Sequence, residues 1–229
     1  MSTEQPADTS EIYMAHDMFR REFSLLPGLI RGVKDGDAER AGVIADHFAL
    51  IHSVLYHHHH GEDTHTWPLL RARAGAGADA VARAMESQHE EMDAVLAEIT
   101  AWLASWRETA DVEQGIALAD AAERLRHLLI VHLAAEEERA LPLIELHVTA
   151  AEFDQGVQEE VADVSPDQII LLTGMVLYEA SPQATRKVIG NLPPEFRPVI
   201  ADGLAAEAFA RYCERVHGTP APAKIGSVR

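Results

Sequence analysis

The chain has 229 residues, of which 47% are apolar and 24% charged, and its 37 acidic against 19 basic residues give a formal net charge of −18. Nucleic acids and anionic membranes are bound by clustered Lys and Arg, so this balance argues against both as partners. The single cysteine, Cys213, cannot form an internal disulfide. The sequence shows neither a secretory signal nor an apolar membrane span, which predicts a soluble, cytoplasmic protein.

Four long helices are predicted in the first two thirds of the chain. Widely spaced turn signals separate segments rich in Ala, Leu, Glu and Arg, which favour helix. The predicted helices span residues 10–33, 37–63, 79–106 and 111–139, with a short helical stretch after Pro68. Because the links are short, consecutive helices should be antiparallel. The fold class is therefore predicted as all-α, an up-down-up-down four-helix bundle.

The predicted helices become shorter from about residue 150. Ser165-Pro166 and Ser181-Pro182 each have the pattern of a helix start, and Leu192-Pro193-Pro194 precedes a last predicted helix over residues 195–216. We expect a flexible N-terminus over 1–9, a bundle over 10–148, a C-terminal helical extension over 149–217 and a flexible tail over 218–229. The extension should cover one flank of the bundle or form a homo-oligomer interface.

The sequence contains an internal repeat built from His and Glu. His58-x-x-x-Glu62 recurs 74 residues later as His132-x-x-x-Glu136, and a Pro follows each pair, at positions 68 and 142. A further His precedes each pair, His16 by 42 residues and His89 by 43. When the chain is folded back at turns near residues 36, 76 and 110, these residues differ in height by only about 1.5 to 3 Å. All six therefore lie at one level of the predicted bundle.

The residue types at this level suit a metal centre. An i,i+4 pair on a helix points to one side, so each His-x-x-x-Glu delivers an imidazole and a carboxylate together. A carboxylate can bridge two cations about 3.5 to 4 Å apart. Imidazole and carboxylate without thiolate suit iron, manganese or zinc. The repeat therefore predicts a dinuclear metal site.

This pattern resembles that of hemerythrin-like proteins with the HHE cation-binding domain, in particular the bacterial H, HxxxE, H, HxxxE variants. The resemblance covers residues 10 to about 145, including both prolines. It implies a non-heme di-iron centre with an oxo or hydroxo bridge in a four-helix bundle. The implied metal ligands are His16, His58, Glu62, His89, His132 and Glu136.

Some neighbouring residues are alternatives or additions to this ligand set. Within the run of four His at 57–60, His59 with Asp63 is a second i,i+4 pair that competes with His58 and Glu62. Tyr56, His65 and Asp93 are candidate extra ligands, whereas His57 and His60 should point away from the centre.

Two classes of function follow. The oxygen-carrying hemerythrins have an HxxxH pair on the third helix, but here Asp93 follows His89 by four residues and Met85 precedes it by four. The missing imidazole leaves an additional position open, which favours turnover of hydrogen peroxide, O2 or nitric oxide by a catalase-like oxidoreductase. The family resemblance implies a role in stress protection. The alternative is a non-catalytic protein that binds, stores or senses oxygen or iron. A dinuclear zinc hydrolase is disfavoured, because no candidate base is present beyond the ligands.

Overall fold

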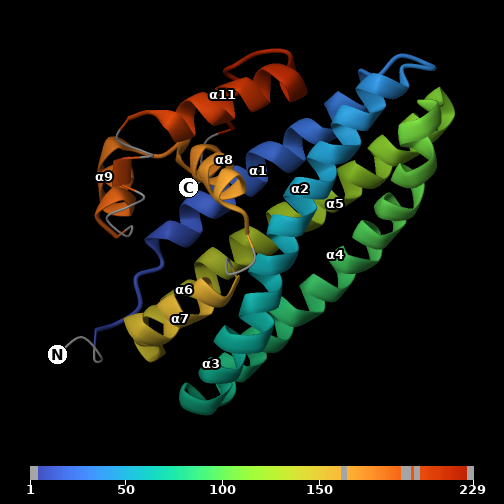
Figure 1. The fold of residues 1–229 in the computed structure, drawn as a ribbon. Coiled ribbons are helices and arrows are strands. Elements are labelled where there is room, and N and C mark those ends of the chain that lie inside the picture. The colour runs from blue at the N-terminus through green and yellow to red at the C-terminus, as the bar shows by residue number, and fades with distance from the viewer. Residues whose placement is uncertain (1–4, 161–163, 192–196, 199–201, 226–229) are drawn as a thin grey trace. The chain divides into compact units, whose positions relative to one another are not determined.

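The structure is a computed structural model that describes residues 5–160, 164–191, 197–198 and 202–225 (Figure 1). Within these ranges the secondary structure is helical, apart from an isolated β-bridge between Pro6 and Thr149. The four long helices are α1 (Ser10–Arg31), α2 (Ala38–Gly61), α4 (Gly75–Thr109) and α5 (Val112–Arg139). The predicted all-α fold is confirmed.

The chain forms two compact units. The first contains the described residues up to Thr9 and from 22 to 160; the second contains residues 10–21 and the described residues from 164 onward. Helix α1 therefore contributes its N-terminal half to the second unit and its C-terminal half to the first. The domain boundaries expected at residues 9, 148 and 217 stay predictions.

The first unit is an antiparallel bundle of α2, α4, α5 and the C-terminal half of α1. Asp37 and Asp111 cap α2 and α5, each accepting a hydrogen bond from the backbone N–H three residues ahead. The two inter-helix turns meet at one end, where the Gly36 N–H donates to the Ala110 carbonyl at 3.2 Å. A buried apolar stripe on each helix forms the core of this bundle.

Helix α2 continues into two further segments. A π-helix, η1 (Glu62–Thr66), follows directly, and the Trp67 N–H donates to the Glu62 carbonyl five residues back. Then α3 (Trp67–Arg73) carries Pro68 in its first turn, where the missing N–H is tolerated. In the second copy of the repeat the chain instead ends α5 at Arg139 and begins α6 (Leu141–His147). The backbone conformation after the His-Glu pair therefore differs between the two copies.

Helix α7 (Ala150–Glu160) and the N-terminal residues complete the first unit. The Ala7 N–H donates to the Val148 carbonyl at 2.9 Å, and the Ala150 N–H donates to the Gln5 carbonyl at 2.8 Å. The Arg73 guanidinium holds the pKa of the Glu152 carboxyl well below its usual range, with further hydrogen bonds from Thr149. These bonds join residues 5–7 to the chain between α6 and α7, and the start of α7 to Arg73 of α3.

The second unit packs α8 (Pro166–Leu177), α9 (Pro182–Asn191) and α11 (Leu204–His217) with residues 10–21 of α1. The predicted Ser165 and Ser181 caps are confirmed, since each side chain accepts a hydrogen bond from a backbone N–H three residues ahead. Residues 192–194, where a break is predicted, lie outside the described residues. Helix α11 begins later than expected because Gly203, with φ +79°, places a left-handed turn before it.

Helices α8 and α11 approach each other closely. A Cβ on Gly174 would lie 2.2 Å from the Ala205 carbonyl oxygen, so only glycine allows this contact. Next to it the buried Arg21 guanidinium donates to the Met175 carbonyl at 2.9 Å and lies 5.2 Å from the Phe209 ring centroid. This arginine therefore joins three segments of the second unit.

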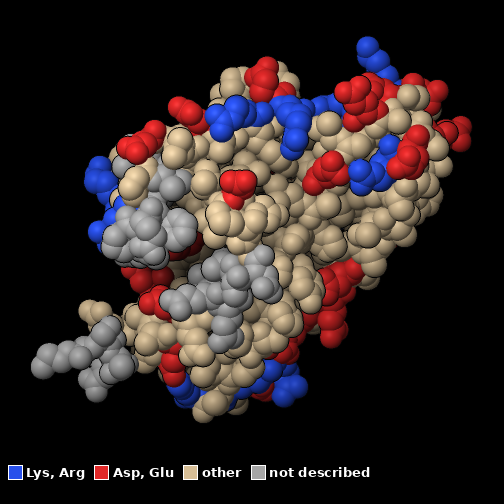
Figure 2. Space-filling model, in the orientation of Figure 1, with Lys and Arg blue, Asp and Glu red and all other residues tan. Residues whose placement is uncertain are grey.

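Charged side chains of both signs are scattered over the face shown in Figure 2. On the first unit several exposed cations pair with acids of a neighbouring helix, as in Arg31–Asp120 at 2.9 Å and Arg124–Glu98 at 2.7 Å. Such exposed pairs contribute little to stability, about 0 to 1 kcal/mol each. Among the residues described, no helix combines the length and apolarity that crossing a membrane requires.

Candidate metal centre

Helix α2 and the π-helix η1 that follows it supply the first His-Glu pair. His58 Nε2 lies 3.4 Å from Glu62 Oε1, as the i,i+4 spacing predicts, and the Glu62 side chain is 7% exposed. The π-turn begins at Glu62 itself. Segments of π-helix are rare and occur frequently at functional sites.

Helix α5 supplies the second pair. His132 Nε2 lies 3.5 Å from Glu136 Oε2, and both side chains are fully buried. An ionised carboxylate is costly to bury unless it is hydrogen-bonded, paired or bound to a metal ion. Two such carboxylates at one level, Glu62 and Glu136, therefore indicate that the centre holds positive charge.

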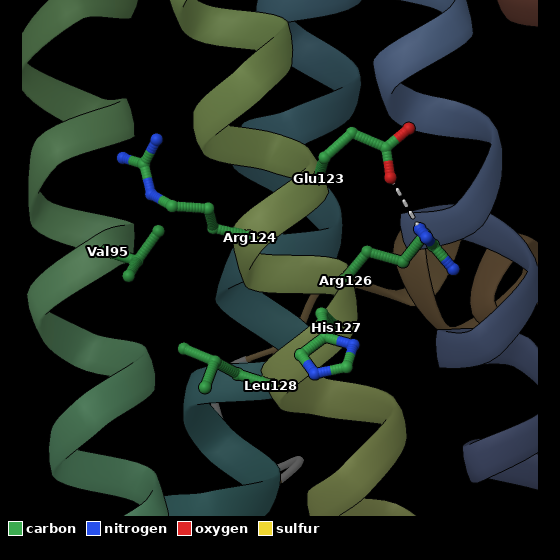
Figure 3. A pocket seen from close by; sticks show the side chains of 6 residues that line it. All are labelled: Val95, Glu123, Arg124, Arg126, His127 and Leu128. Atoms are coloured by element: carbon green, nitrogen blue, oxygen red, sulfur yellow. Dashed lines mark hydrogen bonds and ion pairs between the residues drawn. The ribbon is translucent and has the colours of Figure 1, made fainter.

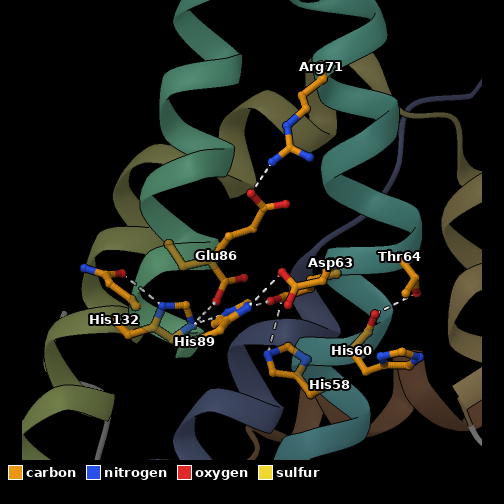
Figure 4. A network of polar contacts seen from close by, with 11 residues as sticks. His58, His60, Asp63, Thr64, Arg71, Glu86, His89 and His132 are labelled. Carbon is orange, nitrogen blue, oxygen red and sulfur yellow. Dashed lines mark hydrogen bonds and ion pairs between the residues drawn. The ribbon is translucent and has the colours of Figure 1, made fainter. Parts of the chain in front are cut away.

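Helix α4 places His89 between the two pairs. Its Nε2 lies 3.5 Å from Glu62 Oε2 and 3.3 Å from His132 Nε2 (Figure 4). Five of the six predicted ligands thus form a continuous series of contacts within the first unit. One ligand atom from each of Glu62, His132 and Glu136 lies within 4.8 Å of the other two.

Two side chains orient the imidazoles from outside. His89 Nδ1 lies 3.0 Å from Asp63 Oδ1, and His132 Nδ1 lies 3.1 Å from Gln88 Oε1. An oxygen acceptor on Nδ1 favours a proton there and turns Nε2 inward, where it can bind a metal ion in the neutral ring. Metal-binding histidines are commonly held in this way by a carboxylate or carbonyl on the other nitrogen. With both Nδ1 atoms engaged outside, the two Nε2 atoms face each other 3.3 Å apart at the centre, an arrangement that fits a metal ion.

The sixth predicted ligand, His16, lies in the N-terminal half of α1. That half belongs to the second unit, so the position of His16 relative to the other five stays a prediction from the sequence.

The structure also brings His59 to the centre, where the sequence gives it only as a competitor of His58. Ring nitrogens of His59, His89 and His132 lie within 4.8 Å of one another. The His59 ring stacks on that of His89, with centroids 4.0 Å apart and an angle of 13° between the planes. Since Asp63 contacts His89, both i,i+4 pairs, which begin on α2 and end on η1, contribute side chains to the site. The buried stripe of α2, which His59 continues, is the sequence signal that could have found it.

Two of the candidate extra ligands, Tyr56 and Asp93, lie on the exposed faces of α2 and α4. Tyr56 is 51% exposed and its ring stacks on His60, with centroids 5.5 Å apart. Asp93 is exposed on α4 and its charge acts on His52, whose pKa is lowered mainly by burial. His57 and His60 are exposed, as expected.

A further buried pair lies away from this centre. His47 Nε2 is 3.5 Å from Glu22 Oε2, and both side chains are fully buried. His47 precedes His58 by 11 residues on α2, about 16 Å along the helix axis. This pair therefore cannot share a metal ion with the His-Glu cluster.

An open depression between α4 and α5 is lined by Val95, Glu123, Arg124, Arg126, His127 and Leu128 (Figure 3). Its charged groups are paired: Arg126 Nε lies 2.8 Å from Glu123 Oε2, and Arg124 pairs with Glu98 outside the lining at 2.7 Å. It offers no cluster of metal-ligating groups comparable to that around Glu62 and Glu136.

The fold and the His-Glu cluster define a metal-binding four-helix bundle. The family model of the hemerythrin HHE cation-binding domain matches residues 7–144, and the chain belongs to this family. The family and the clusters together indicate that the protein binds a metal. Comparisons with curated proteins and with solved structures gave no match.

Proposed function

We propose that the protein is a cytoplasmic non-heme di-iron protein that binds small oxidants, namely hydrogen peroxide, O2 or nitric oxide. Its role would be protection against oxidative or nitrosative stress. The observation that carries this proposal is the pair of buried carboxylates, Glu62 and Glu136, surrounded by inward-facing imidazole nitrogens. The two irons would be held by His16, His58, Glu62, His89, His132 and Glu136, with an oxo or hydroxo bridge.

The chain's own residues set the conditions for this chemistry. Glu62 and Glu136 each offer two oxygens and can bridge two cations. Asp63 and Gln88 hold the outer nitrogens of two imidazoles and so orient their inward nitrogens toward the centre. Met85 and Met92 are buried on α4 within one turn of His89 on either side, so bulk water is excluded there. Bound iron would supply the electrons exchanged with the oxidant.

Peroxide turnover follows from the predicted ligand set. Four imidazoles and two bridging carboxylates occupy eight of the roughly twelve positions of two six-coordinate ions. Bound iron would supply the remaining positions for peroxide and exchange electrons with it, so that one peroxide molecule would be reduced to two waters while another is oxidised to O2.

A second candidate is non-catalytic binding, storage or sensing of oxygen or iron. One observation favours it: His59 lies at the centre and offers one more donor than the six predicted. A further ligand would leave fewer positions open for turnover.

Metal analysis with an optical spectrum tests the proposal. Protein produced with adequate iron should contain close to two irons per chain and absorb in the near ultraviolet through the bridge. Stoichiometric zinc under these conditions, or less than one metal per chain after reconstitution, would contradict it.

Reaction with the oxidants separates the two candidates. Oxidised protein mixed with peroxide should release O2 faster than the same amount of free iron. A stable spectrum of reduced protein with O2 that reverses on degassing, without O2 release from peroxide, would instead establish the binding protein.

A further inference from the structure

We propose that His59 is a fifth imidazole ligand, which binds the same metal ion as His89 and His132. The inference rests on the proposed metal centre and adds a residue that the HxxxE pattern does not include. It starts from the convergence of the three rings, whose nitrogens lie within 4.8 Å of one another. The His59 side chain comes from the same turn of α2 as His58, so one helix would supply an imidazole to each of two ions.

The position of His59 on α2 directs its side chain into the bundle. The buried stripe of α2 and η1 runs in steps of three and four residues: Ile44, Phe48, Ile51, Leu55, His59 and Glu62. His59 is 5% exposed, and its Nε2 atom is buried. This residue therefore faces the interior for the same reason as the apolar residues before it.

The second copy of the repeat shows what the fold requires at this position. Helix α5 carries the same stripe 74 residues later: Leu118, Ala122, Leu125, Leu129, Leu133 and Glu136. Leu133 is the counterpart of His59 and is fully buried. Packing is thus satisfied by an apolar side chain, and burying an imidazole instead costs desolvation unless it is hydrogen-bonded or coordinated.

The surroundings of His59 are those of a metal ligand. Its ring lies 4.0 Å from the His89 ring and 5.0 Å from the His132 ring, centroid to centroid. Those two imidazoles have their outer nitrogens held by Asp63 and Gln88. A third imidazole beside them brings one more ring nitrogen within 4.8 Å of theirs, where a cation can bind all three.

Five imidazoles make the centre asymmetric. One ion would be bound by His59, His89 and His132 together with the bridging carboxylates. The other would be bound by His58, and by His16 as the sequence predicts, with the same carboxylates. The protein would then fill nine of the roughly twelve coordination positions, and the ion at His58 would have more open positions than its neighbour.

Counting coordinated imidazoles in the full-length protein tests the proposal. In the iron(II)-loaded chain under anaerobic conditions, each coordinated imidazole with a protected N–H gives a paramagnetically shifted, solvent-exchangeable proton signal. His59→Leu reproduces the residue of the second copy at the equivalent position. It should remove one signal and weaken binding of one of the two ions at least about tenfold, as losses of even outer-shell groups do. An unchanged number of signals and unchanged affinity would overturn the proposal.

Two further variants separate coordination from packing. His57→Ala, which changes the exposed neighbouring residue, should leave the signals and the affinity unchanged. His59→Ala should lose the same signal, and added imidazole should restore affinity by binding in the space created. Circular dichroism of the metal-free variants reports folding independently. Failure of imidazole to restore affinity in a folded His59→Ala protein would count against coordination.

The outcome for the wild type distinguishes the two proposals. Two bound irons, with signals that His59→Leu does not alter, would overturn the role of His59 and leave the di-iron centre intact. A wild-type chain that binds no iron would overturn the proposed function and this inference with it.

Discussion

Glu136→Gln should stabilise the metal-free protein and abolish the stabilisation that metal gives. The Glu136 carboxylate is fully buried, and in its cluster with Glu62 and His132 the ligand atoms lie within 4.8 Å of one another. Two carboxylate charges at that distance repel by about 3.5 kcal/mol at an effective dielectric constant of 20. Neighbouring imidazoles offset part of this repulsion, and the new amide must itself be hydrogen-bonded. We expect a net gain of about 1 to 2 kcal/mol, or roughly 3 to 6 °C in Tm.

With metal bound, the wild type should be more stable than Glu136→Gln. An ion present at a thousand times its Kd stabilises the native state by about 4 kcal/mol. The wild type should gain about this much from manganese(II), a probe that avoids oxidation, whereas Glu136→Gln should gain little. Urea denaturation of both proteins, with chelator and with manganese(II), measures the four free energies of unfolding.

The control is Glu138→Gln, because Glu138 is exposed and lies two residues further along α5. It should behave like the wild type under both conditions. Our reasoning would be refuted if metal-free Glu136→Gln were less stable than the wild type, or if manganese(II) stabilised both proteins equally.

Three further changes test other parts of the structure. Asp63→Asn should weaken metal affinity about 10- to 100-fold in a chelator competition, because the acceptor at His89 Nδ1 becomes weaker, whereas Glu90→Gln at an exposed site should not. Glu62→Ala should lose most of the bound metal by elemental analysis, while His147→Ala should keep it; equal metal contents would show that the site is elsewhere. Gly174→Ala should destabilise the packing of α8 on α11 by about 3 kcal/mol in thermal denaturation, since its Cβ would lie 2.2 Å from a carbonyl oxygen.

The fold of the first unit could be predicted because its signals are local. Asp37 and Asp111 mark helix starts by their capping chemistry, and both cap as expected. The level of the cluster follows from counting residues from each turn at a fixed rise per residue. Glu62, His89 and His132 therefore come together as the count predicts.

The part played by His59 could not be read from the repeat. Aligning the two copies selects His58 as the counterpart of His132, and this choice makes His59 an alternative rather than an addition. Adjacent residues on an α-helix diverge by about 100°, so a stripe centred between two of them can bring both to one site. The buried stripe of α2, continued through Leu55, contains this information, but the His-Glu spacing alone does not.

The second unit was predicted only in outline, because its packing depends on residues distant in sequence. The Ser-Pro starts of α8 and α9 are local signals. The contact of Arg21 with the Met175 carbonyl joins residues 154 positions apart, and no sequence pattern around Arg21 predicts it. Likewise, the need for glycine at position 174 comes from the close approach of Ala205, which the local sequence does not indicate.

The divergence between the two copies of the repeat bears on the choice between turnover and binding. Both copies keep the His-x-x-x-Glu pair, but the first has His59 and a π-turn where the second has Leu133 and a helix break. With six ligands the two ions would be equivalent, and four coordination positions would stay open for peroxide. With His59 as a ligand only three stay open; if a solvent-derived bridge fills one on each ion, a single position is left, on the ion at His58. Whether His59 coordinates a metal ion therefore decides how many positions an oxidant can reach. Counting the coordinated imidazoles of the iron-loaded protein is the measurement that links the ligand set to the function.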